Sequence, residues 1–120
     1  METPHGQAAR LSDLVAMEGV LLAFEFAPDG SLSDYRARTN LPREQAALAA
    51  QFSASITMMF NTLAGAFTAL TSMKWTPQQA WAYAGGQYTV AIGGGYRGVF
   101  IETAKADFNS IFEKLAGSRW

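Results

Sequence analysis

The stretch EFAPDGSLSDY, residues 25–35, joins a run of large apolar residues to a more polar, alternating run through a single Asp-Gly step. Asp29-Gly30 supplies the left-handed backbone geometry that a tight β-hairpin requires, and Pro28 ends the pairing because proline has no backbone N–H. The preceding residues 20–27 carry apolar side chains on both faces, which predicts an interior strand. Residues 32–37 are predicted to return beside it.

Outward from this hairpin, the apolar spacing predicts three helices and three further strands. Residues 8–18 form a helix that ends before Gly19, and the uncharged stretch 45–73 forms a long one. Three short strands are expected near residues 79–84, 87–93 and 97–103, and a helix over residues 106–115 closes the chain, with Gly117 just beyond its end. The order α-β-β-α-β-β-β-α predicts an α/β sandwich of the α+β type, with helices on the faces of one antiparallel sheet.

The composition excludes several classes of protein. The 120 residues fit one domain, expected over residues 1–120 with residues 1–7 as a flexible tail. Nine Lys and Arg against ten Asp and Glu form no basic cluster, which argues against nucleic acid as a partner. The absence of cysteine excludes disulfides, thiolate metal sites and a thiol nucleophile. The amino terminus lacks the apolar core of a signal peptide, so we expect a cytoplasmic location.

Groups for acid–base chemistry are scarce, and we expect neither a catalytic site nor a cofactor or metal site. Glu25 has two readings, a polar group of a buried site or a carboxylate that reaches solvent or a helix end. The second is favoured because unpaired carboxylates are rarely buried deeply. The segment GGGYRGVF, residues 93–100, lacks the Gly-Lys-Ser/Thr ending of a phosphate loop and is predicted to be a hairpin turn.

The long helix is predicted to lie on the sheet through one stripe of bulky side chains. Its 29 uncharged residues would suffice to cross a bilayer, but Gln45, Gln51 and Asn61 lower its hydropathy, which argues against insertion. Burial in protein on two sides is the favoured interpretation. The stripe expected on the sheet consists of Leu48, Phe52, Ile56, Met59, Leu63, Phe67 and Leu70.

A second row of small or neutral residues follows the same spacing and is predicted to contact the same helix of a second copy. A homodimer is expected because twofold pairing is the commonest assembly. The predicted dimer interface consists of Ala46, Ala50, Ser53, Thr57, Asn61, Ala64 and Thr68.

Aromatic residues crowd the second half of the chain, where they build a core or anchor an interface. Trp81 is predicted to fill the core. Trp75, Tyr96 and Arg97 are candidate contacts to a partner. A small-ligand pocket under the long helix is an alternative, with a lining of Met58, Met59, Phe60 and Trp81 and with Glu25 as its polar group.

The sequence resembles the roadblock/LC7 superfamily across nearly the whole chain. The resemblance rests on the order of elements, the MEGV step (17–20), the FEFAPDGSL hairpin (24–32), the long helix and the closing segment 88–115. EFAPDG, KWTP, GVF and ADFN look most like an uncharacterised branch found in bacteria and archaea, some with sulfur-based metabolism. The resemblance implies a five-stranded antiparallel sheet, dimerisation through the long helix or a sheet edge, and no catalytic residues.

The resemblance also implies a function, because superfamily members act as scaffolds or regulators of small Ras-like GTPases, and others are dynein light chains. We therefore expect a non-enzymatic, homodimeric scaffold or regulator that binds another protein, with a small GTPase as the implied partner. The alternative is an accessory subunit of a metabolic redox complex of the sulfur-oxidation type.

Overall fold

The computed structural model describes residues 10–116; the predicted tail 1–7 and Gly117 lie outside this range. One antiparallel sheet contains five strands in the order β2-β1-β5-β4-β3. The strands are β1 (Val20–Phe26), β2 (Leu32–Ala37), β3 (Ala80–Ala84), β4 (Tyr88–Gly93) and β5 (Arg97–Glu102). The helices are α1 (Leu11–Val15), α2 (Arg43–Thr71), the short 3-10 helix η1 (Thr103–Lys105) and α3 (Phe108–Ala116).

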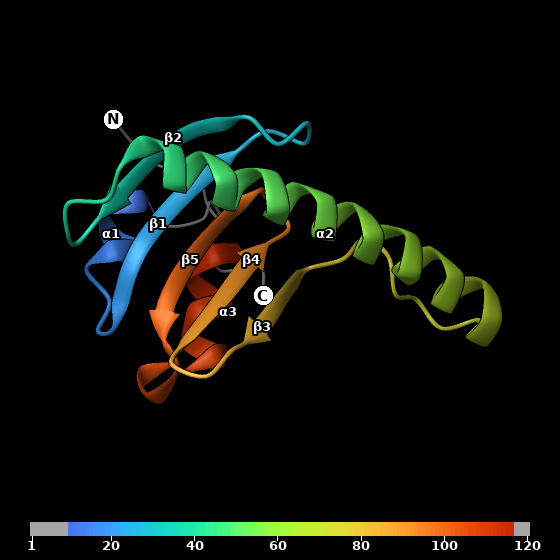
Figure 1. Ribbon diagram of the computed structural model, residues 1–120. Coiled ribbons are helices and arrows are strands. Elements are labelled where there is room, and N and C mark those ends of the chain that lie inside the picture. Colours follow the sequence, from blue (N-terminus) through green and yellow to red (C-terminus); the bar gives the residue numbers. More distant parts are fainter. Residues whose placement is uncertain (1–9, 117–120) are drawn as a thin grey trace, which may run out of the picture.

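The helices cover both faces of the sheet (Figure 1). On one face, α1 packs on β1 and α3 packs on β4, with a core that includes Leu14, Val99 and Ile111. On the other face α2 crosses the sheet, above a second core that includes Phe24 and Trp81. The predicted α+β sandwich is confirmed, and β1 is an interior strand, between β2 and β5.

The turn between β1 and β2 is built as its sequence predicts. Gly30 has a φ of +94°, and its backbone N–H donates to the carbonyl of Ala27 at 2.8 Å. Asp29 Oδ1 accepts from the backbone N–H of Ser31 at 2.9 Å, and the Ser31 hydroxyl donates to the same oxygen. The segment between β4 and β5 is likewise a turn, in which Tyr96 adopts a φ of +62°.

The first helix is shorter than predicted, with Leu11–Val15 in place of residues 8–18. Its end is fixed by Arg38, which follows β2. The Arg38 guanidinium donates from Nη2 to the carbonyls of Val15 and Met17, at 2.6 and 2.8 Å, and from Nε to the carbonyl of Val20 at 2.9 Å. These contacts hold the chain in a turn between α1 and β1. The helix therefore ends at Val15, although the apolar spacing in the sequence continues beyond it.

The long helix runs well beyond the sheet that it covers. At about 1.5 Å per residue, the 29 residues of α2 span roughly 44 Å, whereas five strands about 4.8 Å apart are roughly 19 Å wide. The amino-terminal half of α2 packs on β1 and β2. The carboxyl-terminal half projects past β3, and the segment after it returns below it to the sheet (Figure 1).

Candidate interaction site

The sheet-facing side of α2 is made of small residues, which reverses the predicted orientation of this helix. Ala46 and Ala50 are 0% exposed, and Ser53, Thr57 and Ala64 are buried as well. The predicted dimer interface therefore faces the chain's own sheet or the returning segment. Its other two members also bind within the chain: Asn61 accepts from Gln78 Nε2 at 2.7 Å, and Thr68 Oγ1 accepts from the backbone N–H of Trp75 at 3.0 Å.

The size of the side chains on the sheet explains the reversal. The face below α2 already carries large residues, among them Phe24, Phe26 and Trp81. Two layers of bulky side chains would hold the helix away from the sheet, whereas alanines let the backbone approach and fill space at normal packing density. The predicted stripe of bulky residues is therefore wrong as the sheet-facing side, except that Ile56 is half-buried against this core.

One buried hydrogen bond fixes this orientation. The indole N–H of Trp81 on β3 donates to Thr57 Oγ1 at 2.8 Å, and both side chains are buried. A buried donor without a partner costs free energy, so this pair favours the rotation of α2 that brings Thr57 over β3. The prediction that Trp81 fills the core is confirmed.

Several bulky residues of α2 lie away from the sheet, toward solvent. Phe52 is 66% exposed, Met59 63% and Leu70 80%. On this side apolar residues alternate at intervals of three and four along three heptads, a spacing typical of a helix that packs along another helix. We call this row the α2 seam; it consists of Ala49, Phe52, Ile56, Met59, Leu63, Ala66 and Leu70. Ala49 and Ile56 lie at its edge, where they are half-buried against the core under the helix.

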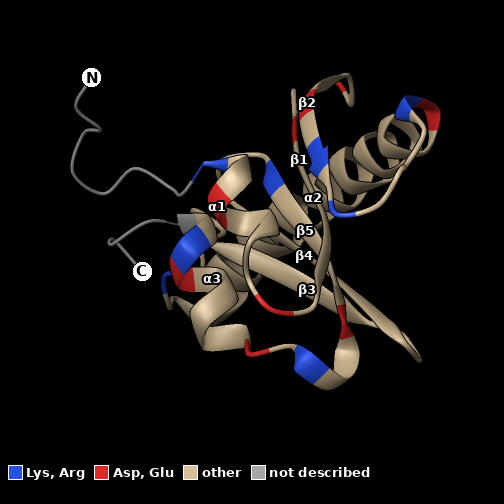
Figure 2. Cartoon of the chain, turned by 90° about the vertical axis from the view of Figure 1, so that its left-hand side faces the viewer, with Lys and Arg blue, Asp and Glu red and all other residues tan. Residues whose placement is uncertain are grey.

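The surface around the seam is almost free of charge. Between Gln45 and Tyr96 the only charged residue is Lys74. Figure 2 shows the charged positions of α2 confined to one end, and others on α1, α3 and the strands beside them. An exposed apolar row within an uncharged surface is typical of a protein interface and uncommon on a monomer.

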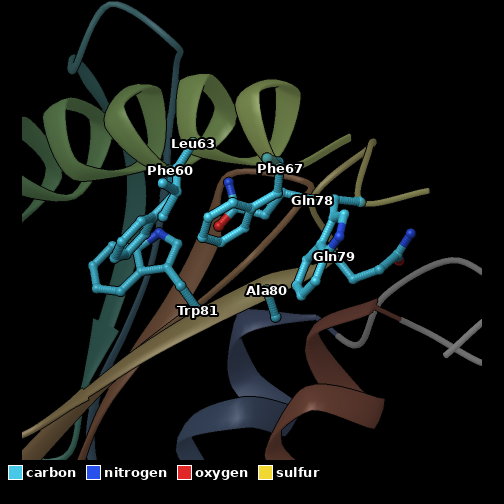
Figure 3. Close-up of a pocket in the computed structure, with 9 residues that line it drawn as sticks. Phe60, Leu63, Phe67, Gln78, Gln79, Ala80 and Trp81 are labelled. Atoms are coloured by element: carbon cyan, nitrogen blue, oxygen red, sulfur yellow. The ribbon is translucent and has the colours of Figure 1, made fainter. Parts of the chain in front are cut away.

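An aromatic groove lies beside the seam, between the projecting half of α2 and β3. It has a volume of about 280 Å³. Two ring pairs line it: Phe60 lies 5.6 Å from Trp81, and Phe67 lies 5.1 Å from Trp75, measured between ring centroids. Figure 3 shows Phe60, Phe67, Gln78 and Trp81 around the same hollow. The complete lining is Phe60, Leu63, Ala64, Phe67, Trp75, Gln78, Gln79, Ala80 and Trp81.

This groove corresponds only in part to the small-ligand pocket that the sequence suggested. Phe60 and Trp81 line it as expected. Met58 and Met59 are exposed elsewhere on α2, each at 63%. Glu25 does not line the groove, because its side chain pairs with Arg97 and lines a polar cavity beside α1.

The three candidate partner contacts lie in different places. Trp75 is at the rim of the groove and is 46% exposed. Tyr96 is half-buried and packs edge-on against Phe26 at 5.6 Å. Arg97 lies opposite Glu25 on neighbouring strands, and its guanidinium donates from Nε to Glu25 Oε2 at 2.8 Å. Sequence analysis missed this ion pair, since the two residues are 72 positions apart and meet only through the strand register.

Within residues 10–116, no three His, Cys, Asp or Glu side chains come together as a metal site would require. None of the helices in the same range combines the length and hydropathy of a membrane span.

The chain has the fold of a roadblock/LC7 domain. It is similar to the crystal structure of a Roadblock/LC7 domain from Streptomyces avermitilis, with a TM-score of 0.73 and 14% sequence identity over 88% of this chain and 85% of that chain. It is also similar to MglB of Myxococcus xanthus, with a TM-score of 0.56 and 12% identity over 93% of this chain and 90% of that chain. The chain belongs to the family described as an uncharacterized conserved protein, DUF2173, whose sequence pattern matches residues 10–117. No protein of curated function matches it.

Proposed function

We propose that this protein is a non-enzymatic, homodimeric interaction module, and that two copies pair through the α2 seam. The observation that carries the proposal is the row of bulky side chains on the solvent side of a helix that has no charged residue from Gln45 to its end at Thr71. A twofold pairing brings the same row of each copy together and removes both from water.

The projecting half of α2 supports the same assembly. A helix that extends past its own sheet leaves its apolar residues without a layer to pack on. A second copy supplies that layer, because its seam has the same heptad spacing and its β3 offers an uncharged sheet edge, AWAYA. Unprotected edges of this kind pair readily with another chain, and most monomers block them with charge or proline.

Two neighbouring methionines give a matched test of the seam. Met58 and Met59 are each 63% exposed, but only Met59 lies in the seam. Met59→Glu places a carboxylate from each copy in the dimer interface, where a charge without a partner costs several kcal/mol. We expect the dissociation constant to rise at least ~100-fold, about 2.7 kcal/mol. Met58→Glu adds the same charge outside the seam and serves as the control.

The measurement is the molar mass by light scattering during size-exclusion chromatography, over a range of protein concentrations. The proposal predicts a dimer for the wild type and for Met58→Glu, and a monomer for Met59→Glu. A wild-type monomer, or a Met59→Glu dimer that is as stable as the wild type, would contradict pairing through the seam.

The partner beyond the second copy is proposed from the roadblock/LC7 resemblance, which supports a small Ras-like GTPase. A subunit of a metabolic redox complex is the alternative. Co-elution of the purified dimer with proteins encoded beside its gene separates the two. A stable complex with a GTPase supports the regulatory role, and a complex with redox subunits supports the accessory role.

A further inference from the structure

We propose that the polar cavity beside α1 binds a small organic phosphate. The cavity has a volume of about 400 Å³, which is within the usual range of small-molecule sites. It lies on the α1 face of the sheet, opposite the α2 seam, so two copies that pair through the seam leave it open. The site is therefore independent of the proposed dimer. Six polar residues line it: Arg10, Ser12, Glu25, Asp34, Arg36 and Arg97.

The strand register gathers most of the charged residues of this cavity. Glu25 on β1 lies opposite Asp34 on β2 and Arg97 on β5. Arg97 pairs with Glu25, and Arg36 pairs with Asp34. Both carboxylates are thus matched by an arginine, whereas Arg10 makes no ion pair within residues 10–116. Three arginines against two carboxylates leave the cavity with an excess positive charge, which favours an anionic ligand.

The donors that remain open suit a phosphate group. Nη1 of Arg36 donates to Asp34 Oδ1 at 3.1 Å and to the carbonyl of Tyr35 at 3.0 Å, which orients the guanidinium. Its Nε and Nη2 make no hydrogen bond within the described residues, and this forked edge matches two oxygens of an oxyanion. The side chains of Arg10 and Ser12 are also without a hydrogen bond in that range. A phosphate monoester offers three oxygens to these three residues, whereas a carboxylate offers two.

The rest of the cavity suits an organic group that carries hydroxyls. An inorganic phosphate ion is much smaller than the cavity and would leave most of it to water. The backbone N–H of Tyr35 and the Arg36 guanidinium both donate to Oδ1 of Asp34, so its Oδ2 accepts no hydrogen bond within residues 10–116. This oxygen can accept from a hydroxyl of the ligand. The ligand class is therefore a small phosphorylated polyol.

The test is isothermal titration calorimetry of the full-length protein with glycerol phosphate, in a buffer that contains no phosphate. Glycerol, which lacks the anion, and glycerate, which carries a carboxylate instead, serve as control ligands. We expect saturable binding of glycerol phosphate, weaker binding of glycerate and no binding of glycerol. Arg36→Gln and Arg10→Gln each remove a guanidinium from the cavity, and each is expected to raise the dissociation constant at least about tenfold.

Arg43→Gln is the matched control, because Arg43 is an exposed arginine at the start of α2 that does not line the cavity. It changes the net charge by the same amount and is expected to bind within about twofold of the wild type, which separates a local site from the charge of the whole protein. The assignment is overturned if glycerol phosphate does not bind, if glycerate binds equally well, or if Arg36→Gln and Arg10→Gln bind no more weakly than Arg43→Gln.

Discussion

Thr57→Val tests the orientation of α2 directly, because it removes one hydroxyl from the buried bond to Trp81 and keeps the shape of the side chain. The valine leaves the Trp81 indole N–H without an acceptor in a region where both residues are buried. A buried donor that loses its partner costs about 1–3 kcal/mol. With a fall in the melting temperature of about 4 °C per kcal/mol for a domain of this size, we expect a decrease of about 8 °C for a loss of ~2 kcal/mol.

The assay is thermal unfolding followed by circular dichroism, at one protein concentration because self-association makes the melting temperature depend on it. Thr62→Val is the matched control: Thr62 is exposed on the same helix, and its hydroxyl bonds only to the carbonyl of Met58. This control is expected to change stability by less than about 0.5 kcal/mol. If Thr57→Val were as stable as Thr62→Val, the buried bond and the orientation argued from it would be wrong.

Two further predictions concern the ends of the β1–β2 pair. Arg38→Ala removes three hydrogen bonds to backbone carbonyls of the α1–β1 connection, and we expect it to lower the free energy of unfolding in urea by about 2 kcal/mol. The control Arg36→Ala breaks one exposed ion pair and is expected to lower it by less than about 0.5 kcal/mol. Equal losses for the two variants would contradict the role of Arg38. The pKa of Asp29 lies below its usual 3.8 because the Ser31 hydroxyl and backbone N–H donate to it, so its contribution to stability is present above pH 3.8 and is lost as pH falls through the lower folded pKa. The stability difference between wild type and Asp29→Asn should therefore shrink in acid, and a difference that is independent of pH would refute this.

The elements of the fold were predictable because each has a local cause. The Asp29-Gly30 turn, the apolar strand before it and the uncharged helix all follow from short stretches of sequence, and their bounds agree within about two residues. The first helix is the exception. Its end depends on Arg38, which is distant in sequence and meets the helix only after β1 and β2 have paired.

The placement of α2 was less predictable, because the sequence shows two rows of residues but not which one meets the sheet. The bulky row was predicted to meet the sheet, and the structure places the small row there instead. The choice depends on volume: Phe24, Phe26 and Trp81 already fill the space above the strands, so alanines must face them. A comparison of side-chain sizes on the two layers would have given this signal.

The candidate site was found in part. Trp81 and Phe60 were expected near each other under the long helix, and Trp75 was expected to be exposed. The groove itself depends on the projection of α2 past β3 and on the return of the segment below it. Neither feature is encoded in local periodicity, since both follow from the width of the sheet relative to the length of the helix.

The most direct test of pairing through the α2 seam is cysteine cross-linking, which the absence of native cysteine makes unambiguous. Met59→Cys and Leu63→Cys place a thiol near the middle of the seam, and Ser53→Cys places one under the helix against its own sheet. After oxidation, the account predicts a disulfide-linked dimer for at least one of the two seam variants and none for Ser53→Cys. Cross-linking through Ser53→Cys, or monomers from both seam variants, would contradict it.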